Sequence, residues 1–435
     1  MRDEPTGQPP ADEVTRALTG LDDYTVIAAH DDPVEGLVID VASRRRETPC
    51  PACGVFSARV KSVRVLVVTD APAHGRRCRL RVARRAFRCD TPGCERQSFT
   101  EASDEVPRRA RVTTRCRTAM GRAGRDRSTA SVAAEYGVSW PTAWRAIAAA
   151  AGAAIAARPT TRAPRRLGLD ETRFWWRQPW LTGLVDLDTG DVLDVVEGRT
   201  GAAVHGWLDN LEPDTLARID VVVTDPHAGY RRAVADRLGG ATQVVDRFHV
   251  AMLANKALTD VRRRRIWEQQ DRRGRLVDPG WRARRDLLRR RGRLSDRGWQ
   301  RVLAAVVVDN DHSDEVDGEL LYAWAAKEHL ADIYNQCHNA AHARRRLSWW
   351  YGFIAEHPVP ELVRLATTIS AWEDEFLAYF ATKATNGRTE GTNRIIKHIK
   401  RLGFGFTNTE NYRLRILYRC RPLPSNPPAK ALPAA

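Results

Sequence analysis

Three acidic residues, far apart along the chain, occupy positions where a carboxylate can do chemistry. Asp170 ends the apolar run in RRLGLDE, and Asp225 ends the buried run in RIDVVVTD. Glu390 opens the segment TEGTNRIIKHIKRLGFG, which is otherwise basic. Three such hard oxygen donors, brought together, can hold two Mg²⁺ ions. A pair of ions of this kind stabilises the attacking and leaving oxygens of an in-line displacement at phosphorus.

Each carboxylate also has a purely structural interpretation. An aspartate often follows a buried strand, and a glutamate at a helix start complements the helix dipole and pairs with a downstream arginine. The segment around Glu390 has a helical pattern in which the following residues share one face: Glu390, Asn393, Arg394, Lys397 and Arg401. We predict that Glu390 is a metal ligand and that the other four residues contact DNA.

The segments that carry the two aspartates alternate between strand and helix patterns. Their predicted order is a strand, a hairpin partner around Thr189-Gly190, a further strand, a helix, a strand, a helix and a strand. A sheet whose first and fourth strands each end in an aspartate is the plan of the ribonuclease H-like fold, in which those two strands are neighbours. We assign 161–250 to the first part of this catalytic core and 386–421 to its final helix, with Glu390.

A basic helical insertion is predicted between these two parts, at 251–385. Residues 262–293 hold 14 arginines, with Trp267 and Trp281 among them. A charge run is usually a solvated face, but aromatic rings among the arginines favour DNA contact, because they can stack on unpaired bases. Trp324 is expected to lie in the core.

The charge balance indicates a polyanionic partner. The 435-residue chain carries 70 Lys+Arg against 54 Asp+Glu, a formal net charge of +16, which favours nucleic acid. An anionic membrane surface is the competing partner. The N-terminus has no signal-peptide core, and the longest apolar run, AIAAAAGAAIAA, is nearly all Ala and too short to span a bilayer. We expect a cytoplasmic protein with reduced cysteines.

Four of the eight cysteines have metal-ligand spacing. Cys50 and Cys53 form C-x2-C, and further along the chain Cys89 and Cys94 form C-x4-C. Two such pairs on tight turns, separated by β-like sequence, are typical of a zinc ribbon that holds one structural Zn²⁺. We assign 24–103 to this domain, predicted to bind DNA. The remaining cysteines are interpreted as ordinary buried thiols: Cys78, Cys116, Cys337 and Cys420.

A helix-turn-helix pattern follows at 104–160. One apolar helix ends at Gly137, and Ser139 can cap a second helix that carries Trp144 and Arg145. A plain helical hairpin is the alternative, but the arginines upstream favour DNA, with Trp144 and Arg145 as contacts. The Pro-rich termini, 1–23 and 422–435, are predicted to be disordered. The predicted fold class is therefore multidomain α+β.

The combined motifs resemble bacterial insertion-sequence transposases of the DDE type, in the ISL-three family. The resemblance covers roughly residues 25–420 and rests on CPACG with FRCDTPGC, LGLDE, TDPHAGYRRAV with VVDRFHV, and TEGTNRIIKHIKR with NYRLRI. It implies a catalytic triad of Asp170, Asp225 and Glu390. The long stretch between the second and third acids fits a helical insertion. DRFH matches a D-x-x-H signature at Asp246 and His249, where His249 is either a core histidine or an active-site auxiliary.

The resemblance implies a DNA transposase that binds terminal inverted repeats and catalyses metal-dependent strand cleavage and strand transfer. Each active site would hold two Mg²⁺ (or Mn²⁺) ions, and the chain would act on double-stranded DNA as a dimer or larger assembly. One alternative is a domesticated, non-cleaving transcriptional regulator of the same architecture. Another is a structure-specific nuclease, which would not need the helix-turn-helix. We also expect a fragment ending near residue 160 to bind terminal DNA specifically.

Overall fold

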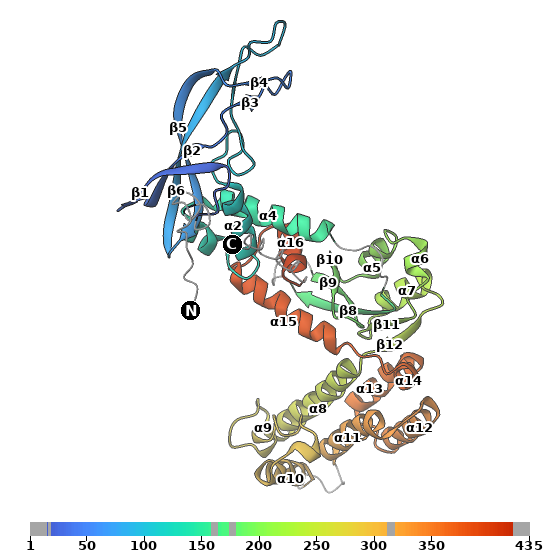
Figure 1. The fold of residues 1–435 in the computed structure, drawn as a ribbon. Helices are drawn as coiled ribbons and strands as arrows, with labels where there is room; N and C mark the ends of the chain where they lie inside the picture. Colours follow the sequence, from blue (N-terminus) through green and yellow to red (C-terminus); the bar gives the residue numbers. More distant parts are fainter. Residues whose placement is uncertain (1–14, 16–18, 158–163, 174–179, 311–317, 421–435) are drawn as a thin grey trace, which may run out of the picture. The chain divides into compact units, whose positions relative to one another are not determined.

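The computed structural model describes residues 15, 19–157, 164–173, 180–310 and 318–420 (Figure 1). The chain forms two units, one of Met1–Arg158 with His398–Ala435 and one of Pro159–Lys397. The predicted disordered tail and most of the predicted disordered N-terminus lie outside the described residues. Disorder up to residue 23 is wrong for the last part of that stretch, because Leu21 is 1% exposed in an apolar core.

The first unit begins with a mixed sheet of long strands. Its order is β1(Tyr24–Asp32), β2(Gly36–Ser43), β6(Arg76–Arg88), β5(Val60–Ala73), and β7(Ser98–Thr100) also pairs with β6. These strands coincide with the β-like runs of the sequence. Alternate apolar residues such as Val41, Leu80 and Val82 form the buried core, as expected for a sheet with one covered face.

The cysteine pairs lie in loops of this domain. The two-stranded ribbon β3(Thr48–Pro49) and β4(Phe56–Ser57) encloses the first pair, and the second pair lies between β6 and β7. Gly54 and Gly93 have positive φ angles of 73° and 74°, so the turn after the first pair and the turn within the second need residues without a side chain.

Three helices follow the sheet: α2(Thr114–Ala123), α3(Thr129–Tyr136) and α4(Trp140–Ala156). Ser128 caps α3 through its side chain, and Gly137 ends α3 with a left-handed φ of 62°. Ser139 takes the N-cap position of α4, as the sequence predicts, but makes no capping hydrogen bond to the backbone. The C-terminal helix α16(Thr409–Cys420) packs against α4 in the same unit.

The second unit is built on a five-stranded sheet. Its order is β10(Val192–Glu197), β9(Trp180–Asp186), β8(Arg166–Arg173), β11(Val221–Thr224), β12(Thr242–Val245). Neighbours are antiparallel from β10 to β8 and parallel from β8 to β12. Asp170 does not end its strand as predicted, because β8 continues to Arg173.

The two faces of this sheet have different covers. Leu167, Leu169 and Val222 pack with α5(Gly201–Leu208) and α7(Ala228–Arg237), next to the short α6(Pro213–Leu216). On the opposite face, Val223 joins a core formed with helices further along the chain. Because side chains alternate along a strand, Gly168 and Asp170 face the same side as Val223.

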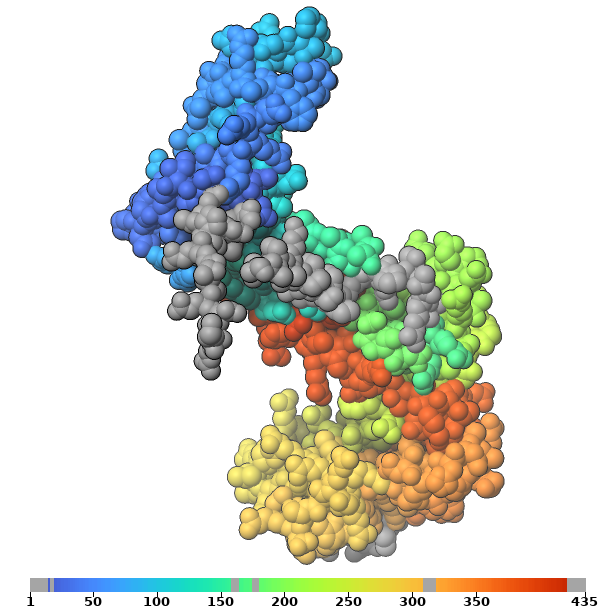
Figure 2. Space-filling view, viewed as in Figure 1, coloured from blue at the N-terminus to red at the C-terminus, as the bar shows by residue number. Residues whose placement is uncertain are grey.

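The described residues from 247 to 382 contain helices and no strand. These are α8(Arg247–Gln270), α9(Pro279–Arg282), the 3₁₀ helix η1(Arg291–Arg293), α10(Asp296–Asn310), α11(Glu319–Gln336), α12(Ala340–Glu356), α13(Pro360–Ala371) and α14(Glu373–Thr382). They gather in the yellow-to-orange body of Figure 2. Trp324 is 9% exposed in their core, as predicted.

The helix α15(Gly387–Leu402) contains Glu390 and continues past the boundary between the units, which falls after Lys397. The predicted core segment 386–421 is therefore divided, because its second half, including α16, groups with the N-terminal domains. The described residues contain no helix that is long and apolar enough to cross a membrane.

Candidate active site and metal centres

Asp170 and Asp225 come from neighbouring parallel strands. The strand register pairs Val221 with Arg166 and Val223 with Gly168, so the next positions bring Asp225 level with Asp170. Both side chains leave the sheet on the same face, since each is two residues beyond a residue of that face. The convergence of the two aspartates that the strand order predicts is therefore present in the structure.

The next strand contributes a third carboxylate and a histidine. Asp246 follows β12 and caps α8 by accepting a hydrogen bond from the Phe248 amide at 3.1 Å. One turn later, His249 Nδ1 lies 2.8 Å from Asp225 Oδ1 and 3.4 Å from Asp246 Oδ2. The D-x-x-H spacing thus arranges a histidine between two carboxylates at the junction of β12 and α8. Its role as an active-site auxiliary stays a prediction.

Helix α15 is fixed to this group by buried amides. Asn393 donates a hydrogen bond from Nδ2 to Asp170 Oδ2 at 2.6 Å. Asn386, which is fully buried, donates from Nδ2 to the Leu169 carbonyl at 2.9 Å and from its backbone amide to Asp246 Oδ1 at 3.0 Å. Thr389 Oγ1 donates to Asn386 Oδ1 at 2.8 Å. A short polar network therefore joins α15 to β8 and to the start of α8.

Gly168 makes this close approach possible. A Cβ atom at this position would lie 2.6 Å from Asn386 Oδ1, Thr389 Oγ1 and Leu187 Cδ2. Asn386 and Gly168 are not among the site residues predicted from the sequence. The signal for the helix was its buried stripe, Thr389, Asn393, Ile396 and Ile399, whose helical spacing already indicates the inward face.

Burial and mutual repulsion shift the pKa values of this group. Burial, and then the charge of Asp225, raise the pKa of Asp170 to about 7. Burial would lower the pKa of His249, but its interactions with Asp225 and Asp246 outweigh burial and raise that pKa to about 10. Burial opposes ionisation of Asp246, yet the contacts with His249 and the Asn386 amide lower its pKa. A shifted carboxylate beside a second one is typical of sites that bind metal or protons.

The donor set fits a divalent cation. Ligand atoms of Asp170, Asp225 and His249 all lie within 4.8 Å of one another. Two buried acceptor oxygens, Asp225 Oδ1 and Asn393 Oδ1, have no hydrogen-bond donor among the described residues. His249 Nδ1 forms an ion pair with Asp225 Oδ1, but the two atoms are not oriented for a hydrogen bond. Carboxylate and amide oxygens without a hydrogen-bond donor are ligands that suit a hard cation such as Mg²⁺ or Mn²⁺.

Glu390 is close in sequence to this network but is not part of the tight group. No set of three metal-ligand residues with Glu390 as a member lies within 4.8 Å in the described part of the chain. Glu390 is half-buried one helical turn before Asn393, and it lines a cavity of about 670 Å³ together with Asp246 and Phe248. Its role as the third acid stays a prediction.

The predicted DNA-contacting residues of α15 divide into two classes. Arg394, Lys397 and Arg401 are exposed. Asn393 is 8% exposed and bonded to Asp170, so its placement on the DNA-facing surface is wrong. The reason is geometric: Asn393 shares the buried stripe with Ile396, whereas Arg394 is turned about 100° around the helix.

In the helix-turn-helix, the two predicted contacts lie near the start of α4. Arg145 is exposed, and Trp144 is half-buried with its ring stacked on the exposed Trp140 at a centroid distance of 6.0 Å. DNA contact by these residues stays a prediction.

Many arginines of the 262–293 run have structural partners. Arg264 pairs with Glu361 at 2.9 Å, Arg272 pairs with Asp278 at 2.7 Å, and Arg262 is 8% exposed. Trp267 is exposed, whereas the Trp281 ring lies under the Arg284 guanidinium at 3.5 Å. Only part of the run is therefore available to a polyanion, and its exposed members include Arg263, Arg273, Arg275, Arg282 and Arg285.

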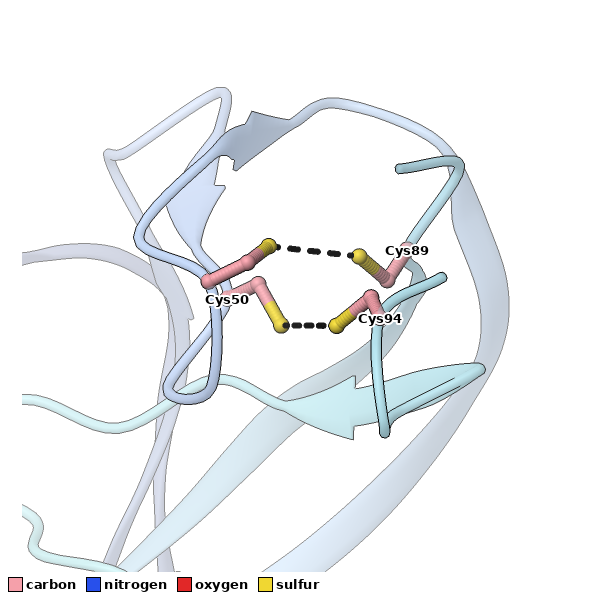
Figure 3. Close-up of side chains that lie close together, drawn as sticks. Cys50, Cys89 and Cys94 are labelled. Atoms are coloured by element: carbon pink, nitrogen blue, oxygen red, sulfur yellow. Dashed lines mark hydrogen bonds between the residues drawn. The ribbon is translucent and has the colours of Figure 1, made fainter. Parts of the chain in front are cut away.

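The four spaced cysteines form a compact cluster (Figure 3). Sγ of Cys50 lies 3.9 Å from Sγ of Cys94, Sγ of Cys53 lies 3.6 Å from Sγ of Cys89, and all four atoms lie within 4.8 Å of one another. Tetrahedral zinc with bonds of about 2.3 Å separates its sulfurs by about 3.8 Å. Hydrogen bonding with Thr91, and then with the Val55 amide, lowers the pKa of Cys53 to about 6, which favours its thiolate form. The Arg96 amide would lower the pKa of Cys94, but burial and the neighbouring cysteines outweigh it and raise that pKa.

The other cysteines lie outside this cluster. Cys78, Cys116 and Cys337 are buried and Cys420 is half-buried, and all four are free thiols. Their interpretation as ordinary buried thiols agrees with these positions.

Comparison with known proteins gives three family matches in chain order. A zinc finger of the transposases IS204/IS1001/IS1096/IS1165 matches 46–94, a helix-turn-helix domain of transposase family ISL3 matches 101–151, and the ISL3 transposase domain matches 167–416. The transposase for insertion sequence element IS1001 of Bordetella parapertussis is 25% identical over 410 residues, 93% of this chain and 97% of that protein. The transposase for IS1557 of Mycobacterium tuberculosis is 26% identical over 260 residues, 57% of this chain and 58% of that protein's length.

Proposed function

Because this chain belongs to the ISL3 family of DDE transposases, we propose that it binds the terminal inverted repeats of an insertion sequence and catalyses strand cleavage and strand transfer. The observation that carries the proposal is the convergence of Asp170 and Asp225 on one sheet face, beside the buried Asn393 Oδ1, which has no hydrogen-bond donor among the described residues.

The core of the second unit supports a ribonuclease H-like fold. Its strand order β10-β9-β8-β11-β12, antiparallel on one side of β8 and parallel on the other, is the plan expected from the sequence. The helices α8–α14 would then form an all-α insertion between the fifth strand and α15.

In this proposal Asp170, Asp225 and Glu390 are the catalytic acids. Two Mg²⁺ (or Mn²⁺) ions bound there would stabilise the attacking and leaving oxygens of a phosphodiester displacement. Asn393 orients Asp170 through its 2.6 Å hydrogen bond. His249 holds Asp225 and balances its charge. Glu390, one helical turn before Asn393 on α15, is the proposed third acid.

The reaction has two displacements at phosphorus and no covalent protein intermediate. In the first, water attacks the phosphodiester at the element end, which leaves a free 3′-hydroxyl and a 5′-phosphate. In the second, this 3′-hydroxyl attacks a target phosphodiester, so that one bond forms as one breaks. Two ends have to be joined to one target, so the active assembly contains at least two copies of the chain.

The N-terminal domains would select the DNA. The cysteine cluster would hold one structural Zn²⁺, and α4 would enter the major groove with Trp144 and Arg145 near its start. The exposed Arg394, Lys397 and Arg401 of α15 would contact the phosphate backbone beside the catalytic acids.

Cleavage of terminal DNA by the purified full chain tests the proposal. Inverted repeats in the DNA that flanks the coding region give the duplex substrate, and a random duplex of equal length is the control. With Mg²⁺ we expect a nick that leaves a 3′-hydroxyl at the element end, and chelation should abolish it. Specific binding with no cleavage in Mg²⁺ or Mn²⁺ would instead identify a non-cleaving DNA-binding regulator.

A further inference from the structure

The last helix of the described residues, α16, packs against the helix-turn-helix. Helix α4 ends at Ala156 and α16 begins only at Thr409, yet both lie in the first unit and pack together (Figure 1). Four apolar or aromatic residues of α16 are at most 3% exposed: Tyr412, Ile416, Leu417 and Tyr418. The family match for the helix-turn-helix ends at residue 151, so it does not contain this helix.

Polar contacts from α16 hold the turn between α2 and α3. Arg415 donates to the Arg127 carbonyl at 2.8 Å. Arg419 pairs with Asp126 at 2.7 Å, and Arg125 donates to the Arg419 carbonyl at 3.1 Å. The consecutive turn residues 125–127 are therefore each bonded to α16, immediately before the cap of the first helix of the motif.

Two further contacts of α16 are buried. Tyr418 donates its hydroxyl proton to the Gly121 carbonyl of α2 at 3.1 Å. Arg415 is 3% exposed, and its second contact is with the Thr129 hydroxyl at 3.5 Å. Both of its acceptors, this hydroxyl and the Arg127 carbonyl, are neutral oxygens. Burying a guanidinium among neutral acceptors costs free energy, so this side chain should add little to the free energy of unfolding. It is suited to fixing a turn at several points, since its planar fork has five donors.

We propose that α16 is a positioning element of the DNA-recognition module, so that specific binding of terminal DNA requires α16 as well as the helix-turn-helix. The proposal rests on the proposed function. The orientation of α3 relative to α4 determines which base edges the second helix reaches, and α16 fixes the turn that precedes α3 as well as the flank of α4. On this proposal, a fragment ending near residue 160 should not bind specifically, in contrast to the expectation from the sequence.

This arrangement has a consequence for the order of events in synthesis. The recognition module cannot be complete until residues 409–420 have left the ribosome, by which point the whole catalytic domain has been made. A chain that ends before α16 would retain all three proposed catalytic acids but would not bind terminal DNA specifically.

The test uses full-length variants and the ratio of affinity for terminal over random DNA. Arg415→Gln removes the buried donors, and Arg413→Gln removes an equal charge from the same helix, where its partner Glu410 lies at 3.6 Å within α16 itself. We expect Arg415→Gln to lower the ratio by about tenfold or more, because a charged hydrogen bond is lost from a buried site. Arg413→Gln should leave the ratio unchanged.

A charge exchange covers the case in which Arg415→Gln does not fold. Asp126→Arg and Arg419→Asp each place like charges together across the turn, whereas the double variant restores an opposite pair with the original net charge. We expect both single variants to lower the ratio and the double variant to recover it. If the ratio stays at the wild-type value in folded Arg415→Gln, or if the double variant is no better than the singles, the proposal is wrong. A wild-type protein that does not discriminate terminal DNA would instead contradict the proposed function.

Discussion

Replacing Asn393 by leucine should move the pH at which the active site binds metal. The amide of Asn393 donates a 2.6 Å hydrogen bond to Asp170, and the pKa of that carboxyl is raised to about 7 by burial and by Asp225. A protonated carboxyl is a poor ligand, so Mn²⁺ binding to wild type should strengthen as pH rises towards 7 and then level off. Leucine is close to asparagine in shape and removes the polar contact.

The magnitude follows from the strength of the bond. A hydrogen bond to a charged group contributes about 1.5–3 kcal/mol, and about 1.4 kcal/mol corresponds to one pKa unit. The amide stabilises the ionised form of Asp170, so its loss favours the protonated form. The midpoint of the pH dependence of Mn²⁺ affinity should therefore move upward by about one to two pH units in Asn393→Leu.

Calorimetric titration of Mn²⁺ across the neutral pH range measures this midpoint without requiring DNA or activity. Thr392→Val is the matched control, because Thr392 is a buried neighbour whose hydroxyl bonds to the Arg388 carbonyl of the same helix at 3.2 Å. The control should keep the wild-type midpoint. If Asn393→Leu also keeps it, the amide does not tune Asp170 and our description of the site fails.

Further predictions concern the metal cluster, the packing of α15, the pH dependence of stability and the basic insertion. Cys89→Ser should lower zinc from one equivalent per chain, as measured by metal analysis; full zinc content would exclude the four-cysteine site. Gly168→Ala should destabilise the protein by about 1–3 kcal/mol in denaturant unfolding, because its Cβ would lie 2.6 Å from Asn386 Oδ1. The pKa of His249 is raised from 6.5 to about 10, so the stability it contributes is present below pH 6.5 and lost towards pH 10. The difference in unfolding free energy between wild type and His249→Gln should therefore become smaller as the pH rises from 6.5 to 10. A difference that stays constant would contradict the ion pairs of His249 with Asp225 and Asp246. Exposed arginines of the insertion should bind phosphate, so we expect their joint replacement by glutamine to weaken the salt dependence of DNA binding. The slope of log binding constant against log salt concentration should become shallower by about 0.9 for each phosphate no longer neutralised, equally for terminal and random duplexes. An unchanged slope would show that these arginines do not contact DNA. The replaced set is Arg273, Arg275 and Arg282.

The sequence was sufficient where local pattern and function coincide. The cysteine spacing predicted the cluster, because two short turns have to present their thiols in pairs. Gly137 and Ser139 predicted the helix-turn-helix, since one ends a helix and the other begins one. The strand order predicted that Asp170 and Asp225 meet, because parallel neighbours align their carboxyl ends.

Contacts over a long sequence separation could not be predicted in the same way. The apolar face of α16 indicates a buried helix, but periodicity does not identify its partner α4, which ends as early as Ala156. The role of Asn393 was missed for another reason: its helical spacing is compatible with the face of Glu390, Arg394 and Lys397 as well as with the buried stripe. Its spacing from Ile396 and Ile399 places it on the buried stripe. The many internal ion pairs of the arginine run depend on acids from other helices, such as Glu361 for Arg264.

The most direct test of the central claim is strand cleavage by Asp170→Asn, Asp225→Asn and Glu390→Gln, measured beside binding to the same terminal duplex. Each change removes one negative oxygen ligand while keeping side-chain volume, and Glu410→Gln, at an exposed glutamate of α16, is the control. We predict that each of the three variants loses Mg²⁺-dependent cleavage by roughly a thousandfold or more and binds terminal DNA as wild type does. Retained cleavage in any one of them would remove that residue from the catalytic set, and retained cleavage in Asp170→Asn or Asp225→Asn would contradict the account as a whole.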